Sequence, residues 1–229
     1  MEKLKPDTSY HIFNHANGFE NVFSEPENYR FFLEKYRKYI LPVAETYAYC
    51  LMPNHFHLVV RIRKLAVIEK LIQNKINQEP DSKLLNSTNL TKPTNFSKVP
   101  NFGKVDNEIE IEKFLSKQFA NLFSSYTQSY NKSNQRVGSL FIKNFKREPI
   151  LIKAHFINSV IYTHRNPIHH GFCVSYNDWP NSSYFDISNH KTTFVESIKL
   201  LKIFGGYDLF VQKHIDALSN LSTTIFEIP

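Results

Sequence analysis

Cysteine is scarce in this sequence, and long apolar runs are missing. The 229 residues contain only two cysteines, Cys50 and Cys173, which excludes a disulfide framework and a zinc site built from cysteines. No apolar run reaches the roughly 18 residues that a membrane span needs. Residues 1–6 lack the apolar core of a signal peptide. We therefore expect a protein of the reducing cytoplasm with no membrane partner.

The composition indicates a folded and basic protein. Hydrophobic residues make up 41% of the chain, and 229 residues can bury a substantial core as one elaborated domain. Lysine and arginine number 28 against 21 aspartates and glutamates, so the formal net charge is +7. A positive charge of this size favours polyanionic partners, nucleic acid first.

Two closely spaced histidines are the first candidates for chemistry. Pro53 and Asn54 indicate a turn between two strands, because proline is rare inside a central strand. Side chains alternate along the strand that follows, so His55 and His57 point to one face and Phe56 to the other. Two imidazoles on one rigid face can hold a metal ion. A half-exposed strand edge is the alternative interpretation.

Apolar spacing predicts alternating strands and helices along most of the chain. Strands are expected over 10–15, 43–52 and 55 to about 61, with a further possible strand near 136–147. Helices are expected over 26–40, 65–76, 112–131 and 149–166, the last one stopped by Pro167. This order favours an α+β fold with helices packed on one face of an antiparallel sheet.

Composition also divides the chain. Residues from about 77 to 107 are rich in Asn, Ser, Thr, Lys and Pro, which indicates a loop insertion rather than a second domain. We expect one domain over 1–190, with a flexible insertion at about 77–107. A C-terminal helical extension over 191–229 follows, split by Gly205 and Gly206.

Basic and aromatic residues interleave between positions 136 and 147. The positive charges suit phosphates, and the neighbouring phenylalanines offer rings for unstacked bases. The candidate DNA-binding residues are Arg136, Lys143, Lys146 and Arg147.

Several other polar residues fall on predicted elements. Tyr162 and Asn166 are four apart and therefore share one helix face. Tyr126 and Tyr130 lie on an apolar helix face, where packing is the more common role. His11, Asn14 and His15 lie near the end of a strand and could face a site, although surface strand positions are the simpler interpretation. For His164 and His170, surface or turn-packing positions are the simpler interpretation.

Three segments occur in an order that resembles a known family. They are Met52-Pro53-Asn54-His55-Phe56-His57-Leu58, then Gly138-Ser139-Leu140-Phe141, then Tyr162-Thr163-His164-Arg165-Asn166-Pro167. Together they resemble the single-tyrosine transposases with a His-hydrophobic-His motif, most closely the REP-associated tyrosine transposase branch. The resemblance covers about residues 10–184.

The resemblance implies a ferredoxin-like antiparallel sheet with the two histidines on a central strand. His55, His57 and Asn166 would bind a divalent metal ion, Mg or Mn, and Tyr162 would be the nucleophile. Such proteins cut single-stranded DNA beside a folded hairpin and keep the end as a 5′-phosphotyrosine. The chain would be a monomer or a homodimer.

The implied chemistry is coherent. A metal ion that polarises the non-bridging phosphate oxygens lowers the barrier to attack on an anionic phosphodiester. Tyrosine has a reference pKa of about 10, so Tyr162 must lose its proton as it attacks. Two other functions stay open: a catalytically inactive nucleic-acid-binding module, and a metal-dependent hydrolase of small phosphoesters.

Overall fold

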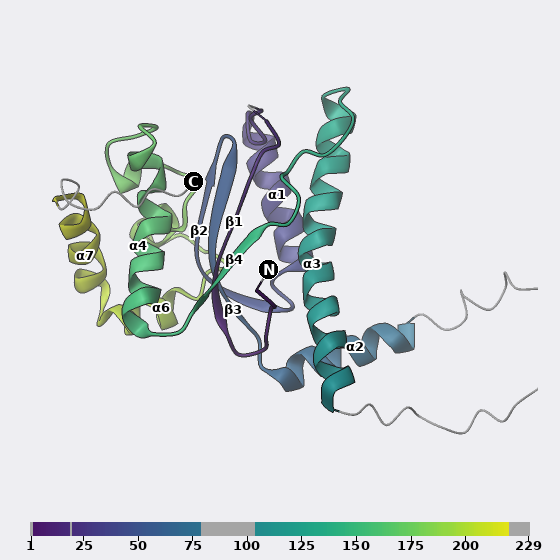
Figure 1. Ribbon diagram of the computed structural model, residues 1–229. Helices are drawn as coiled ribbons and strands as arrows, with labels where there is room; N and C mark the ends of the chain where they lie inside the picture. Colours follow the sequence, from purple (N-terminus) through teal and green to yellow (C-terminus); the bar gives the residue numbers. More distant parts are fainter. Residues whose placement is uncertain (1, 19, 79–103, 220–229) are drawn as a thin grey trace, which may run out of the picture.

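A four-stranded antiparallel sheet forms the centre of the computed structural model, which describes residues 2–18, 20–78 and 104–219. The strands lie in the order β2-β3-β1-β4, with β1 and β3 in the middle (Figure 1). Their bounds are Ser9–His15 for β1, Ala44–Met52 for β2, His55–Ile62 for β3 and Lys146–Ile150 for β4. The predicted α+β fold, with the ferredoxin-like strand order, is confirmed.

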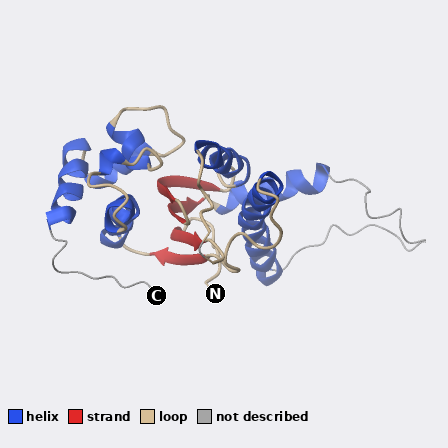
Figure 2. Ribbon diagram, turned by 90° about the horizontal axis from the view of Figure 1, so that it is seen from above, coloured by secondary structure: helices blue, strands red, loops and turns tan. Residues whose placement is uncertain are grey.

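Helices cover both faces of this sheet (Figures 1 and 2). On one face, Phe56 of β3 packs against Phe32 of α1 (Pro26–Tyr39) and Phe123 of α3 (Lys104–Ser133). On the other face, His57 contacts Tyr162 of α4 (Lys153–His169). The second layer continues with α6 (Ser197–Phe204) and α7 (Tyr207–Ser219).

The expectation that helices pack on one face holds for α1 and α3 and has to be corrected for α4. The physical reason lies in the two longest strands. Both β2 and β3 are buried at nearly every position, so their side chains are covered on both faces. A sheet of that kind needs a layer on each side to remove its apolar surface from water.

Several boundaries differ from the predicted ones. The helix α2 (Leu65–Gln78) and the start of α3 occupy the ends of the predicted insertion, and residues 79–103 lie outside the described ranges. Pro149 and Ile150 belong to β4, so α4 starts at Lys153. α4 also continues through Pro167, which lacks an N–H to donate, and helical bonding resumes after it: the N–H of His170 donates to the Asn166 carbonyl (2.9 Å).

The predicted C-terminal extension folds onto the second helical layer. Its described part contains α6 and α7, separated at Gly205 and Gly206 as expected. Before it, the loop around the single tryptophan forms a short 3-10 helix (Tyr176–Asp178) and α5 (Ser183–Ser188). Within the described ranges, none of the helices combines the length and the apolar character needed to cross a membrane. The division into one domain over 1–190 and an extension over 191–229 stays a prediction.

Phe56 should be one of the residues on which stability depends most. Its side chain is fully buried against Phe32, Phe123 and Phe141. Replacing it by alanine should lower the free energy of unfolding by about 3–5 kcal/mol, because a cavity is left between the sheet and two helices. Urea denaturation measures the loss. Val137→Ala, at a position 90% exposed, is the control and should change it by less than about 0.5 kcal/mol.

Candidate metal and nucleophile site

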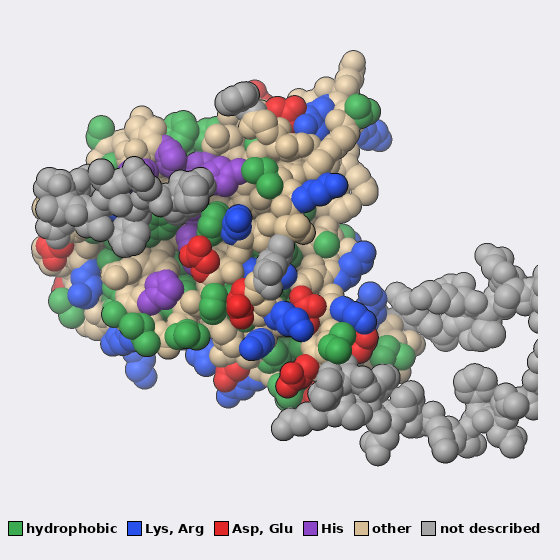
Figure 3. Space-filling model, in the orientation of Figure 1, with side chains coloured by type: hydrophobic (Ala, Val, Ile, Leu, Met, Phe, Trp, Pro, Cys, Tyr) green, Lys and Arg blue, Asp and Glu red, His purple; other side chains and the backbone are tan. Residues whose placement is uncertain are grey.

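The histidine pair of β3 lines a cavity of about 470 Å³ between the sheet and α4. Residues that lie opposite each other on two antiparallel strands point to the same face of the sheet. Phe13 lies opposite His57 and His15 lies opposite His55, so these side chains face the cavity together with the two histidines. The cavity is closed from the other side by the α4 residues Tyr162, Asn166 and His169, and by His170 after the helix. Figure 3 shows histidine side chains gathered at the surface over this end of the sheet.

His55 presents an unused ring nitrogen to this cavity. Its Nδ1 lies 2.7 Å from Oδ1 of Asn54, and an amide oxygen only accepts, so the proton is on Nδ1. The Nε2 atom therefore carries a lone pair, and it is buried without a hydrogen-bond partner among the described residues. Burial lowers the pKa of His55 to about 3, which keeps the ring neutral at pH 7.

His57 is equally buried, at 2% exposure, and is packed on both sides. Its ring stacks against Phe13 (5.4 Å between centroids) and His11 (5.1 Å). The Nδ1 atom is 3.0 Å from Nε2 of His11. Burial lowers the pKa of His57 well below its ordinary value, so this imidazole is also neutral. A neutral imidazole is the form that binds metal ions.

Tyr162 and Asn166 approach the histidines from α4. The Tyr162 ring stands edge-on to His57, with 5.5 Å between centroids and 88° between planes. Its side chain is half-buried, and burial raises the pKa of the phenol, which is protonated at pH 7. The Asn166 amide nitrogen donates to the Tyr162 carbonyl (2.9 Å), whereas its Oδ1 is buried and finds no partner in the described part of the chain.

The competing tyrosines lie elsewhere. Tyr126 and Tyr130 belong to α3 on the opposite face of the sheet, and their hydroxyls donate to the carbonyls of Val22 and Asn21. They therefore do not reach the histidine cavity. Tyr162 is the tyrosine that the fold brings to both histidines.

Sequence reasoning missed part of this site. His11 is buried rather than a surface position, at 5% exposure, and His15 and His170 line the cavity. Asn14 is buried as well, at 4% exposure, but it borders the neighbouring groove. His11, Phe13 and His15 alternate on one strand just as His55 and His57 do, and this shared spacing was the available signal. His164 is not a surface residue either: it is fully buried and bonded to Ser183 and His214.

The residues present fit a divalent metal ion. Two buried atoms with lone pairs, His55 Nε2 and Asn166 Oδ1, lack partners within the described ranges, and His57 supplies a second neutral imidazole. The same ranges contain no group of three His, Cys, Asp or Glu side chains arranged to hold a metal. A metal ion bound here would be held by two imidazoles and one amide oxygen, a donor set that suits Mn²⁺ better than Mg²⁺.

The four predicted DNA-binding residues divide into two pairs. Arg136 makes a bidentate ion pair with Glu20 (2.7 and 2.6 Å), and Arg147 is buried and donates to Ser116 (3.0 Å). These two arginines stabilise the segment that carries them. Lys143 and Lys146 are exposed on the same segment.

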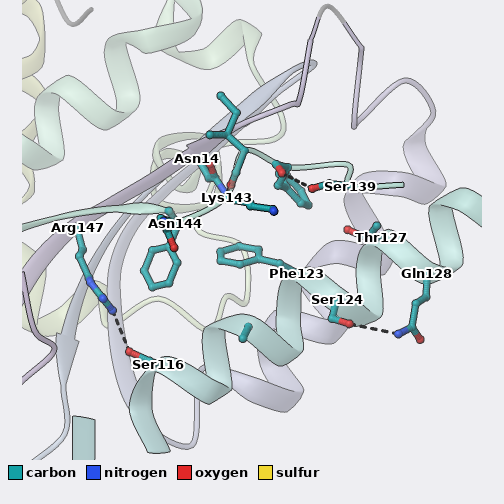
Figure 4. Close-up of a pocket in the computed structure, with 14 residues that line it drawn as sticks. Asn14, Ser116, Phe123, Ser124, Thr127, Gln128, Ser139, Lys143, Asn144 and Arg147 are labelled. Carbon is teal, nitrogen blue, oxygen red and sulfur yellow. Dashed lines mark hydrogen bonds between the residues drawn. The ribbon is translucent and has the colours of Figure 1, made fainter. Parts of the chain in front are cut away.

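Lys143 borders a groove of about 460 Å³ between α3 and residues 139–147 (Figure 4). Its lining combines an aromatic ring with hydroxyl and amide groups, from Asn14, Phe123, Ser124, Thr127, Gln128 and Asn144. Ile142 lines both this groove and the histidine cavity, so the two are neighbours. Such a lining is suited to a base and its phosphate.

Lys143→Ala and Lys146→Ala should weaken binding of single-stranded DNA without affecting stability. Each lost phosphate contact should reduce the slope of log affinity against log salt concentration by about 0.7. Fluorescence anisotropy at several salt concentrations measures this slope. Lys213→Ala, an exposed lysine on α7, is the control. An equal effect from Lys213 would mean that the net charge alone binds DNA.

This is therefore an α+β protein in which the strand that carries His55 and His57 faces Tyr162 on the helix α4. No protein-family model and no curated protein matches the chain. Among solved structures, it is similar to that of the REP-associated tyrosine transposase bound to a REP hairpin, with 12% sequence identity and a TM-score of 0.45. The similarity covers 85% of this chain and 90% of that one.

Proposed function

We propose that this protein cleaves and rejoins single-stranded DNA beside a hairpin, through a covalent link between Tyr162 and a 5′ phosphate. One observation carries the proposal. A half-buried tyrosine shares a cavity with two buried metal-donor atoms that lack partners in the described ranges, on His55 and Asn166. A hydrolase of small phosphoesters does not need that tyrosine, and a binding module does not need those donor atoms.

His55, His57 and Asn166 would hold the divalent ion. A cation bound there neutralises charge on the non-bridging oxygens of the scissile phosphate. The phenol oxygen of Tyr162 attacks phosphorus as the bond to the 3′ oxygen breaks, so a 5′-phosphotyrosine and a 3′-hydroxyl are formed. The phenol proton leaves to a base or to water, and the departing 3′ oxygen takes up a proton. Reversal needs no ATP, because one ester replaces another.

The arrangement supports action in cis. The Tyr162 ring packs 5.5 Å from the ring of His57 in the same chain. A single chain can therefore bring its own nucleophile to its own donor atoms. Beside the cavity, the groove with Lys143 offers a path for the unpaired strand.

The test uses the full chain, a labelled DNA hairpin with a single-stranded flank, and Mn²⁺. A covalent protein–DNA adduct should survive a denaturing gel, and protease digestion should recover the nucleotide on the peptide that contains Tyr162. DNA binding without an adduct would favour the inactive binding module. Turnover of a small phosphodiester with no DNA and no adduct would favour the hydrolase.

A further inference from the structure

A third buried histidine, His11, lies between His57 and an acidic side chain. β1 runs between β3 and β4, and its register places His11 opposite Glu148. Nε2 of His11 is 3.0 Å from Nδ1 of His57, and Nδ1 of His11 is 3.9 Å from Oε2 of Glu148. The three side chains therefore form a row across three strands, and this row ends at a proposed metal ligand.

The chemistry of this row decides which nitrogen of His57 carries the proton. A carboxylate only accepts hydrogen bonds, so Glu148 favours a proton on Nδ1 of His11. With its proton on Nδ1, His11 accepts a hydrogen bond at Nε2 from Nδ1–H of His57. Nε2 of His57 keeps its lone pair, and it is the only nitrogen of that ring left for a metal ion.

The opposite order would block the site. If His11 carried its proton on Nε2, it would donate to Nδ1 of His57, and the proton of His57 would be on Nε2. His57 would then offer no lone pair to a metal ion. Glu148, at the far end of the row, therefore decides whether His57 offers a lone pair to a metal ion.

Glu148 is suited to this role and contributes little to stability. Its contact with His11 is the main cause that lowers the pKa of the Glu148 carboxyl, so the group is charged at neutral pH. Its side chain is 60% exposed, and the 3.9 Å contact is screened by water. A weak attraction is sufficient, because the two tautomers of a neutral imidazole differ little in energy.

We propose that Glu148 and His11 are positioning residues that hold His57 in its metal-binding tautomer and orientation. The metal part rests on the function proposed above, whereas the tautomer is a property of this chain alone. His11 also lies edge-on to Tyr162, with 5.7 Å between ring centroids. The same ring therefore supports both the ligand and the nucleophile.

The first experiment measures the tautomer directly, by ¹⁵N NMR of the histidine rings without metal. In the wild type, Nδ1 of His57 should carry the proton. Glu148→Lys places a donor beside His11 and should move the His57 proton to Nε2, while Glu148→Gln keeps an accepting oxygen and should leave it on Nδ1. This position lies on an edge strand and is half exposed, so the variants should fold. A wild-type proton on Nε2 would overturn the proposal.

The second experiment measures the Mn²⁺ dissociation constant by electron paramagnetic resonance. His11→Phe keeps the ring but removes the acceptor, and should weaken Mn²⁺ binding roughly 10- to 100-fold, as loss of a group that orients a ligand does. His11→Gln returns an acceptor and should recover part of the affinity. Asp7→Asn removes an exposed ion pair with Arg61 on the same sheet and should leave the constant unchanged.

The outcomes distinguish a failure of this positioning role from a failure of the proposed function. If His57→Ala loses Mn²⁺ while His11→Phe binds as the wild type does, the positioning role is wrong and the metal site stands. If His57→Ala binds as tightly as the wild type, the donor set itself is wrong, and the role of Glu148 and His11 falls with it.

Discussion

Tyr162→Phe should reduce the yield of covalent protein–DNA adduct by at least about 1,000-fold and leave hairpin affinity unchanged. The substitution removes one oxygen, the proposed nucleophile, and no other group at the cavity can form the same ester. The ring remains, so its edge-on contacts with His57 and His11 are kept. The exposed lysines that would bind the strand are also untouched. A denaturing gel and an anisotropy titration measure the two quantities.

Tyr126→Phe and Tyr130→Phe are the matched controls. Each of these hydroxyls donates to a backbone carbonyl on the far side of the sheet. Losing that hydrogen bond should lower the free energy of unfolding by about 1 kcal/mol and leave the yield of adduct unchanged. An adduct of normal yield from Tyr162→Phe would show that another residue is the nucleophile.

Local sequence patterns predicted much of this fold and placed two pairs of residues on shared faces, whereas the roles of these four residues were implied by the family resemblance. The strand with His55 and His57 follows a two-residue period, and Tyr162 and Asn166 follow a helical spacing, so each pair shares one face of its own element. The pairs meet because α4 packs across β3. That docking depends on contacts between distant segments, which periodicity does not contain.

The same limit explains the missed residues. His11 reaches His57 and Glu148 through the registers of two strand pairs, over separations of 46 and 137 positions. Register is set by which face is buried and by the turns, not by the spacing within one strand. DNA binding by Arg136 and Arg147 was predicted from their charge and stays a prediction, but that charge did not reveal their partners Glu20 and Ser116.

The two buried histidine groups differ in one decisive respect. In the group around His164, the hydrogen bonds form a complete chain. The amide of Tyr49 donates to Ser183, Ser183 to His164, His164 to His214, and His214 to the carbonyl of Phe210. Every ring nitrogen in this chain has a partner, and Ser183 is fully buried. This group therefore stabilises the second layer, whereas His55 keeps an unused nitrogen.

That structural role makes the fold sensitive to acid. Burial lowers the pKa of His214 from 6.5 to about 4 and also lowers that of His164 well below its ordinary value. The unfolded chain takes up a proton at His214 below pH 6.5, whereas the folded chain does so only below about 4. Stability from this residue is therefore complete above pH 6.5 and is lost as the pH falls toward 4. At about 1.4 kcal/mol per pH unit, the loss is about 3 kcal/mol.

His214→Phe should therefore flatten the acid side of the stability curve. At pH 7 the variant should be less stable by about 1–3 kcal/mol, because the His164 N–H loses its acceptor. Between pH 7 and pH 4, its free energy of unfolding should fall by about 3 kcal/mol less than that of the wild type. Urea denaturation at each pH measures both.

His190→Phe, at an exposed position, controls for the loss of a histidine. His55 and His57 contribute to the acid slope of every variant alike, so only the difference between variants reports on His214. An unchanged slope in His214→Phe would show that the second layer does not depend on this neutral pair.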